Sequence, residues 1–277
     1  MNTPGEAETA YYVYAVAQAR NGNRGEASPS VDLGCSPVYG LRYRDLIAVV
    51  GPVSLAEFGP EVLEANLRDL AWVSAKVLGH QEVLARLLGR HTLIPFKFGT
   101  LFRSEDAVRE MLDRHCQRFY ENLARLEGAA EWGVKLYYDR RALVERVLET
   151  SETLRPLRER ISRASEGAAH FLRKKLDQAA EQEAAQVKDA CVRESHGRLA
   201  SHAREAVANP LMAPEVHRHG MEMIFNGAYL VADGSLQEFR ETLASLDETY
   251  RSQGICYELT GPWPPFSFVA EETNAIQ

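Results

Sequence analysis

Several patterns that would assign a function are missing from this sequence of 277 residues. No run approaches the roughly 20 apolar residues that a membrane-spanning helix requires. The chain begins with polar and acidic residues, unlike the basic and then apolar start of a signal peptide. The net charge of −7 implies no dominant basic surface for nucleic acid. We therefore expect a soluble cytoplasmic protein with no nucleic-acid or membrane partner.

The thiols and imidazoles do not follow the spacing of a metal site. The four cysteines form no CxxC motif, and reduced thiols are expected at Cys35, Cys116, Cys191 and Cys256. The nearest approach to a ligand cluster comes from two histidine pairs, His217 with His219 and His196 with His202. A six-residue step does not place two helical side chains on one face, so exposed histidines are favoured over a zinc site. We predict no metal ligand.

Catalytic and phosphate-binding motifs are also missing. His80, His91 and Glu82 could form an acid–base cluster, but no GxSxG, HExxH or Cys/His motif accompanies them. Neither GxGxxG nor GxxxxGK[ST] occurs. The basic run Arg173-Lys174-Lys175 could contact an anionic surface, although short runs of this kind are usually solvated. We therefore predict no catalytic residue, no cofactor-binding residue and no cofactor.

The residues that are present suit a globular α+β protein. Hydrophobic residues make up 45% and charged residues 26% of the chain, and the length allows two cores. Apolar and β-branched runs predict strands at 11–17, 36–41, 45–51 and 92–95. Helical spacing predicts a helix from Glu61 to about Leu78, ended or kinked at Gly79, then a short helix to Leu88. Ser104 is the expected N-cap of a further helix.

A second pattern follows a weak boundary at Gly128 to Ala130, which divides the chain into domains 1–128 and 129–277. Its strands are predicted at about 134–138, 221–232 and 255–260, and a long helical region at about 140–207 should form a hairpin or arm. Asp233-Gly234 predicts a turn, and Ser235 with Glu238 has the spacing of a capping box. Apart from the long helices, this half is consistent with a small antiparallel sheet faced by helices.

Two aromatic segments are harder to explain as ordinary surface. One is LIPFKFGTLF, from Leu93 to Phe102, in which aromatic residues alternate around Lys97. The other is GPWPPFSFV at 261–269, where Pro262, Pro264 and Pro265 should prevent a helix and hold the chain extended. We expect this C-terminal strap, 261–277, to pack in a groove near the domain junction, facing Leu93–Phe102. Truncation of a buried Trp263 would then cost about 3–5 kcal/mol.

These segments carry a resemblance to a known family. LIPFKFGTLF, the GVKLYYD strand that opens after Glu131, and TGPWPPFSFV resemble characteristic segments of the gas vesicle protein F/L family. Weaker similarity extends through YYVYAV, the segment ending at His80, and AYLV at Ala228–Val231. The similarity follows the order of nearly the whole chain, but the 20–30 loop and parts of the long helical region depart from it.

The resemblance implies a non-enzymatic accessory or minor structural protein of gas vesicle formation. Its implied partners are the small hydrophobic shell protein and other accessory proteins, and its implied fold is two ferredoxin-like α+β domains, the second with extra helices. We expect shell protein to bind exposed apolar surface between the two domains. One alternative is a small-molecule-binding regulatory protein, since ferredoxin-like folds can bind effectors between sheet and helices. Another is a hydrolase or transferase that uses the scattered histidines.

Overall fold

The computed structural model describes residues 9–18, 31–32, 37–211 and 220–273. The chain forms two compact units, the first of Met1–Glu131 with Pro262–Gln277 and the second of Trp132–Gly261. The chain passes between them twice, within strands β7 (Ala129–Tyr138) and β10 (Ile255–Trp263). The division at residue 128 stays a prediction; the contacts place Pro262–Gln277 with the first unit, whereas the sequence had placed the strap in the second domain.

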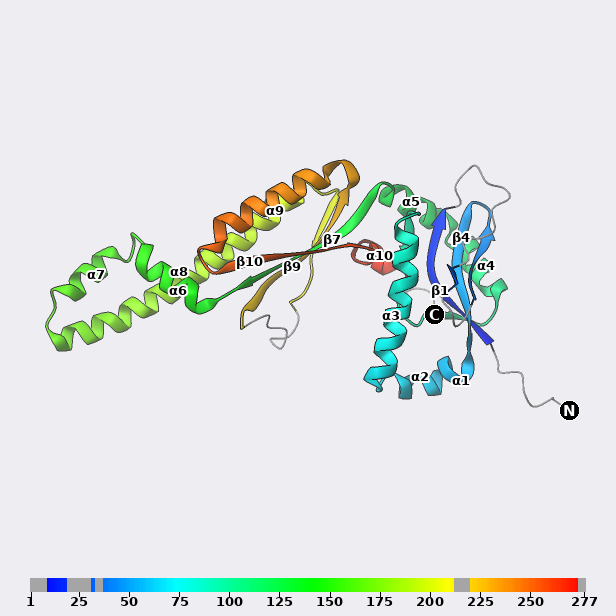
Figure 1. The fold of residues 1–277 in the computed structure, drawn as a ribbon, viewed down its shortest axis with the longest axis horizontal. Coiled ribbons are helices and arrows are strands. Elements are labelled where there is room, and N and C mark those ends of the chain that lie inside the picture. Colours follow the sequence, from blue (N-terminus) through cyan, green and yellow to red (C-terminus); the bar gives the residue numbers. More distant parts are fainter. Residues whose placement is uncertain (1–8, 19–30, 33–36, 212–219, 274–277) are drawn as a thin grey trace. The chain divides into compact units, whose positions relative to one another are not determined.

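The first unit contains an antiparallel sheet in the order β2-β3-β4-β1-β5, with β6 also paired to β1 (Figure 1). Its strands are β1 (Thr9–Gln18), β2 (Val31–Asp32), β3 (Pro37–Tyr43), β4 (Leu46–Ser54), β5 (Leu93–Pro95) and β6 (Leu101–Phe102). β1 and β4 pair along their whole length, and the register shifts once, between Val13 and Ala15. Most residues in the middle of both strands are buried, as their continuous apolar runs predict.

The helices of the first unit begin and end at caps that the sequence patterns only partly predict. They are α1 (Leu55–Phe58), α2 (Pro60–Asn66), α3 (Leu70–Leu88), α4 (Glu105–Arg114), α5 (Cys116–Leu126) and α10 (Phe266–Thr273). The predicted break at Gly79 is wrong, because α3 continues through it. The break lies instead before Leu70, where the Asp69 carboxylate accepts hydrogen bonds from the amides of Ala71 and Trp72. The N-cap at Ser104 is confirmed by its bond from the Ala107 amide.

The second unit has a four-stranded sheet in the order β10-β7-β9-β8, with α9 among its helices (Figure 1). Its elements are β7, α6 (Arg140–Thr150), α7 (Arg155–Ser162), α8 (Glu166–Ala200), β8 (Glu205–Ala208), β9 (Glu222–Ala232), η1 (Asp233–Ser235), α9 (Leu236–Arg251) and β10. The predicted capping box is wrong: Ser235 makes no side-chain cap, because a 3-10 turn precedes α9. The buried residues of α9 are Phe239, Leu243, Leu246 and Tyr250, which recur at helical spacing.

The two sheets have the same strand order. Counting β1, β3, β4 and β5 in the first unit and β7, β8, β9 and β10 in the second, the first strand lies between the third and fourth in both, and the second pairs with the third. The element order β-α-β-β-α-β in the second unit is the one that a ferredoxin-like arrangement requires. The α+β class is therefore confirmed, and the ferredoxin-like description of both units stays a prediction.

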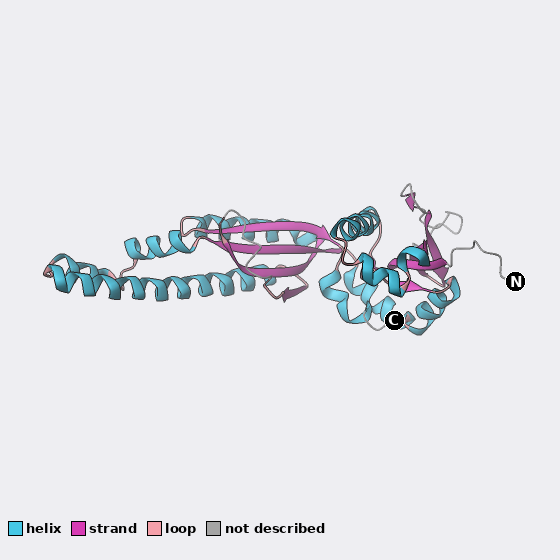
Figure 2. Ribbon diagram, turned by 90° about the horizontal axis from the view of Figure 1, so that it is seen from below, coloured by secondary structure: helices cyan, strands magenta, loops and turns pink. Residues whose placement is uncertain are grey.

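The predicted long helical region is a hairpin, but it contains three helices and stops earlier than expected. α6 and α7 both contact α8, and the arm extends away from the sheet of its own unit (Figures 1 and 2). In the sequence, apolar residues recur at helical spacing from Leu154 to Phe171. This spacing crosses the turn between α7 and α8, so its residues do not share one helix face, and Ala168 and Phe171 are exposed. Val207 lies in β8, not in a helix.

The turn into β10 gives a test of the fold of the second unit. Gly254 has φ +78°, and an added Cβ would lie 2.9 Å from Cβ of Ala142. We expect Gly254→Ala to lower the free energy of unfolding by about 1–3 kcal/mol, because the left-handed backbone and the contact both oppose a side chain. Gly197→Ala is the matched control: nothing lies within 4 Å of its added Cβ in α8, so stability should rise by about 0.5–1 kcal/mol. Urea unfolding of the two variants checks this, and equal effects would contradict it.

Candidate functional site

The C-terminal segment is partly helical. β10 continues through Pro262 to Trp263, and α10 begins at Phe266. The expectation of an extended strap up to Val269 is therefore wrong. Proline is unfavourable inside a helix but not directly before it, where the first amides have no intrahelical acceptor, so Pro264 and Pro265 can precede α10.

The first turn of α10 is held by a buried carboxylate at the start of β7. The Glu131 carboxylate accepts from the Ser267 amide at 2.9 Å and from the Ser267 hydroxyl at 2.7 Å. Arg125 also holds this first turn of α10, because its guanidinium donates to the Phe268 carbonyl at 2.7 Å. A carboxylate at a helix N-terminus satisfies a free amide and interacts favourably with the helix dipole. We call this arrangement the Glu131 clamp.

The side chains around His80 form an aromatic cluster in the first unit: Tyr12, Tyr14, Phe58, Trp72, His80, Phe98 and Phe266. The Tyr14 ring stacks on His80, with centroids 5.6 Å apart, and Phe266 of α10 lies 6.4 Å from His80 on another side. Phe266 also packs against the buried core that contains Leu93. The predicted packing of the strap on the Leu93–Phe102 segment is thus confirmed by α10, which contacts β5.

Hydrogen bonds inside the cluster link Tyr12 both to His80 and to the backbone of Gly99. The Gly99 amide donates to the Tyr12 hydroxyl oxygen at 2.9 Å, and that hydroxyl lies 3.0 Å from Nδ1 of His80. Nε2 of His80 is buried without a hydrogen-bond partner among the described residues. Gly99 has φ +84°, a conformation that glycine adopts without strain.

Burial controls the ionisation of these groups. It lowers the pKa of His80 from 6.5 to about 4, and the Phe96 backbone only partly opposes this. Burial also raises the pKa of Tyr12 well above its usual value, so both side chains are neutral near pH 7. The pKa of Glu131 is raised by burial and lowered again by its two bonds from Ser267. A neutral, closely packed cluster is suited to holding structure and not to acid–base chemistry.

The outer side of α3 is unusually apolar for an exposed helix. Leu70 is 80% and Leu78 69% exposed. Ala71, Ser74 and Ala75 are exposed between them at helical spacing, and we call these five residues the α3 face. Val62 and Leu67, just before α3, are also exposed.

No charged side chain interrupts this face between Asp69 and Glu82. Lys76, which lies in that interval, turns away to Glu57, with Nζ 2.7 Å from its carboxylate and 5.5 Å from the centre of the Phe58 ring. Trp72 donates to the same carboxylate at 2.9 Å. The charge of Lys76 is therefore neutralised by Glu57 on the side of α3 that faces α1.

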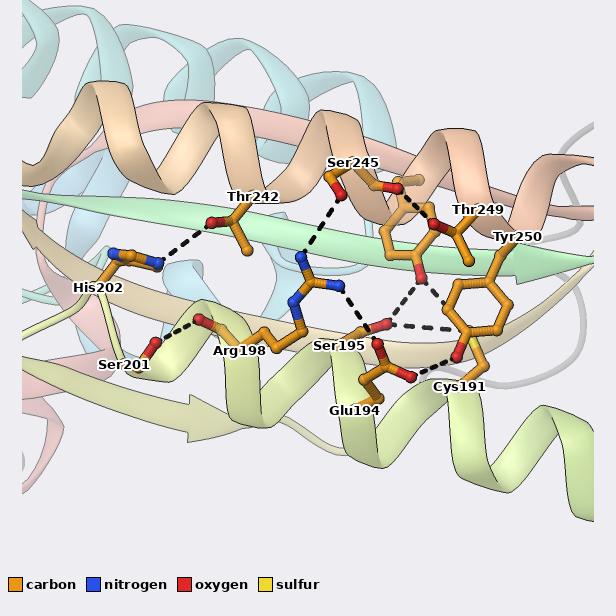
Figure 3. A network of polar contacts seen from close by, with 11 residues as sticks. Cys191, Glu194, Ser195, Arg198, Ser201, His202, Thr242, Ser245, Thr249 and Tyr250 are labelled. Carbon is orange, nitrogen blue, oxygen red and sulfur yellow. Dashed lines mark hydrogen bonds and ion pairs between the residues drawn. The ribbon is translucent and has the colours of Figure 1, made fainter.

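Polar side chains of the second unit form a network between α8, α9 and β10 (Figure 3). The hydroxyls of Ser195 and Tyr257 lie 2.7 Å apart, and Sγ of Cys191 is 3.3 Å from Tyr257. Burial raises the pKa of the Cys191 thiol, which opposes formation of a thiolate nucleophile. Tyr250 donates to Glu194 at 2.7 Å, joining α9 to α8. These contacts hold the helices to the sheet.

The histidines considered as ligands or catalysts separate in space. His196 bonds to Tyr229, and His202 lies 3.1 Å from Thr242 and 3.5 Å from Glu238. His80 is buried while Glu82 is exposed and pairs with Arg86, and His91 begins the turn into β5. Over the described ranges, no group of three or more His, Cys, Asp or Glu side chains is placed to hold a metal ion. His217 and His219 lie outside the described residues.

A surface depression of about 400 Å³ in the second unit is lined by Lys188, Asp189, Val192, Arg193, Leu211, Glu222, Met223 and Ile224. Its lining combines four charged and four apolar residues. The acid–histidine–hydroxyl series of Glu238, His202 and Thr242 lies elsewhere, between α9 and the turn after α8, where the Glu238 side chain is 69% exposed. The series and the depression therefore do not combine into an enclosed site.

Comparison with known proteins agrees with the resemblance seen in these segments. Residues 10–270 match the family described as gas vesicle synthesis protein GvpL/GvpF. The chain belongs to the GvpL/GvpF family. Gas vesicle protein L of Streptomyces sp. (strain CB03234) is 32% identical over 268 residues, which cover 94% of each chain. Gas vesicle protein F of the same strain is 29% identical over 264 residues, covering 93% of this chain and 98% of the relative.

Solved structures of GvpF share the fold. The crystal structure of GvpF from Anabaena sp. PCC7120 has a TM-score of 0.66 at 17% identity and covers 94% of this chain and 98% of that one. GvpF from Microcystis aeruginosa gives a TM-score of 0.59 at 17% identity, with 94% of this chain and 98% of that one covered. Within the described part of the chain, no helix is both long and apolar enough to cross a membrane.

The segments that resemble the GvpL/GvpF family meet at one place in the fold. YYVYAV supplies Tyr12 and Tyr14, LIPFKFGTLF supplies Phe98 and Gly99, and TGPWPPFSFV supplies Phe266. The acidic residue that opens the GVKLYYD strand is the centre of the clamp. Sequence reasoning missed the role of Glu131 and of Arg125, because a carboxylate at the start of a strand carries no periodic signal.

The Glu131 clamp predicts different outcomes for two substitutions. Glu131→Ala leaves the Ser267 amide and hydroxyl without their acceptor, so we expect the free energy of unfolding to fall by about 1–3 kcal/mol. Glu131→Gln retains an acceptor for the amide and a donor for the hydroxyl, so its loss should stay within about 1 kcal/mol. Urea unfolding measures both, and hydrogen exchange at residues 266–269 should quicken in the alanine variant alone. Glu110→Ala, exposed on α4, is the control.

The depressed pKa of His80 predicts a pH dependence of stability. Between about pH 6.5 and 4 the unfolded chain binds the proton and the folded protein does not, so stability falls as the pH falls through this range. A shift of this size corresponds to about 3 kcal/mol. Glu131, whose folded pKa is raised, contributes in the opposite sense, since its ionisation above pH 4.5 destabilises the folded state.

The His80 contribution is therefore measured as a difference between two proteins. In His80→Asn the amide oxygen can still accept from Tyr12, but nothing titrates at this position. Unfolding free energies of the wild type and the variant, measured from pH 7 to 4, should converge as the pH falls. A gap that stays constant would show that His80 does not titrate as its burial requires.

Proposed function

We propose that this chain is a non-enzymatic accessory protein that binds the hydrophobic gas vesicle shell protein through the α3 face. Membership of the GvpL/GvpF family implies a role in gas vesicle assembly and association with gas vesicles. The observation that carries the binding proposal is the exposure of Leu70 and Leu78, at 80% and 69%, on a helix face from which Lys76 is directed away. Such contiguous apolar surface commonly marks an interaction site.

The energetics support a reversible contact. Covering an exposed leucine side chain contributes about 1.5–3 kcal/mol, and the short side chains of Ala71 and Ala75 let a partner helix approach closely. A shell subunit with an apolar gas-facing surface would aggregate before assembly, so transient cover by this face would keep it available. The proposal moves the apolar surface from the domain junction, where the sequence had suggested it, to the first unit alone.

We also propose cytoplasmic binding to other gas vesicle accessory proteins, with no membrane or nucleic-acid partner. Trp263, 45% exposed, is a second apolar position in the first unit. The loss of about 3–5 kcal/mol was expected only for a buried Trp263. Because the ring is partly exposed, Trp263→Ala should lower the free energy of unfolding by less than that amount. The depression in the second unit combines charged and apolar lining residues and selects no specific ligand for the small-molecule alternative.

Copurification tests the proposed contact. The full chain and the shell protein are expressed together, and the double variant Leu70→Lys/Leu78→Lys should retain its melting temperature but recover at least about tenfold less shell protein, a loss of about 1.4 kcal/mol or more. Leu211→Lys, at a position 52% exposed in the second unit, is the matched control and should bind normally. Equal recovery with both variants, or normal vesicles in a deletion strain, would refute the proposal.

A further inference from the structure

The end of the helical arm has a charge opposite to that of the rest of the chain. Residues 155–175 contain seven Arg and Lys residues and two Glu residues, a net charge of +5. The remaining chain has 25 basic and 37 acidic residues, a net charge of −12. This segment comprises α7, the turn after it and the first part of α8, at the end of the arm farthest from the sheet of its unit (Figures 1 and 2). We call it the basic tip.

Four cations of the basic tip lack the ion pairs that other helices of the protein have, although Arg155 pairs with Glu152 at 2.8 Å. Arg140 pairs with Glu181 at 3.0 Å and Arg198 with Glu194 at 3.2 Å, both in the same unit. Among the described residues, four exposed side chains of the tip have no carboxylate partner: Arg160, Arg163, Arg173 and Lys174. Their charge is therefore available to a ligand.

An apolar ring lies among these charges. Phe171 is 59% exposed, and Nζ of Lys175 is 4.7 Å from its ring centre. Lys174 and Lys175 follow Phe171 by three and four positions, so all three side chains occupy neighbouring places on one side of α8. A cation held over an exposed ring presents both charge and apolar surface in a single turn of helix.

The tip is firmly held by its own unit. The Arg158 guanidinium donates to the Ser151 carbonyl at 2.9 Å and also to the Leu148 carbonyl, which fixes α7 to the end of α6. Leu154 and Ala169 are buried at 4% each, where α7 and α8 pack together. Because folding already orders these elements, ligand binding carries little further entropic cost for ordering them.

We propose that the basic tip binds an acidic polypeptide segment, one in which carboxylates alternate with apolar side chains. Charge complementarity favours carboxylates opposite Arg160, Arg163, Arg173 and Lys174, while an apolar side chain covers Phe171. A duplex nucleic acid fits less well, because its phosphates continue past the short tip towards a chain whose remaining net charge is −12. This surface differs from the α3 face, so the two proposals succeed or fail separately.

Fluorescence anisotropy with the full chain tests the inference. The probe is a fluorescein-labelled peptide of repeated Glu-Glu-Leu-Glu units, measured at a salt concentration of about 0.15 M and again at lower salt. We expect binding that weakens with salt, and at least about tenfold weaker binding by Lys174→Glu/Lys175→Glu. Phe171→Ser should weaken binding while keeping the salt dependence. Arg42→Glu/Arg90→Glu, with the same charge change at exposed positions of the first unit, is the matched control.

Two further measurements keep the result decisive. Arg160→Gln/Arg163→Gln removes charge from the turn after α7 without adding any, and it should also weaken binding if the whole tip is used. Equal loss in the tip and control variants, or no loss in any tip variant, would overturn the proposal. Tighter binding to a DNA duplex or to phosphatidylglycerol vesicles than to the peptide would overturn the assignment of an acidic polypeptide.

Discussion

The first unit depends on the buried carboxylate of Glu131. An isolated carboxylate in this position would be costly, and the raised pKa of Glu131 records that cost. Its two hydrogen bonds come from Ser267, 136 positions later in the chain, so the carboxylate is satisfied only when α10 is in place. Placing α10 brings Phe266 against the core and closes one side of the aromatic cluster. The end of the chain is therefore part of the first unit's interior.

The spacing of apolar residues predicted the elements in which a regular apolar pattern runs through the whole element. β1 and β4 were expected close to their observed bounds, because runs of apolar and β-branched residues give a direct signal. The spacing of apolar residues failed as a predictor where a cap or a turn decides where a helix begins or which residues are buried. Asp69 starts α3 by accepting two amides, and the turn at 163–165 exposes Phe171 although its spacing continues the stripe of α7. The start of α10 was missed because proline excludes helix from its own position and not from the residues after it.

The same limit applies to the candidate site. Mutual packing of the Leu93–Phe102 segment and the strap could be predicted, since two aromatic segments each required a groove. The pairing of Tyr12 with His80, and of Glu131 with Ser267, could not, because such partners are set by strand order and carry no local signal. The α3 face could not be predicted from the sequence for another reason. Leu70 and Leu78 have helical spacing, and only the tertiary structure shows that no other element covers this side of the helix.

Partition of the aromatic residues explains why the α3 face is small and aliphatic. Six aromatic rings in the cluster are used internally around His80, which leaves small and aliphatic side chains on the α3 face. Asp69 and Glu82 bound that face, and Lys76 is directed to Glu57, so the uncharged area stays limited to a few turns. A small aliphatic face associates weakly with its own copies, yet it can be covered by a larger apolar partner. Because this contact is apolar and the basic tip is ionic, raising the salt concentration should weaken the second contact and spare the first.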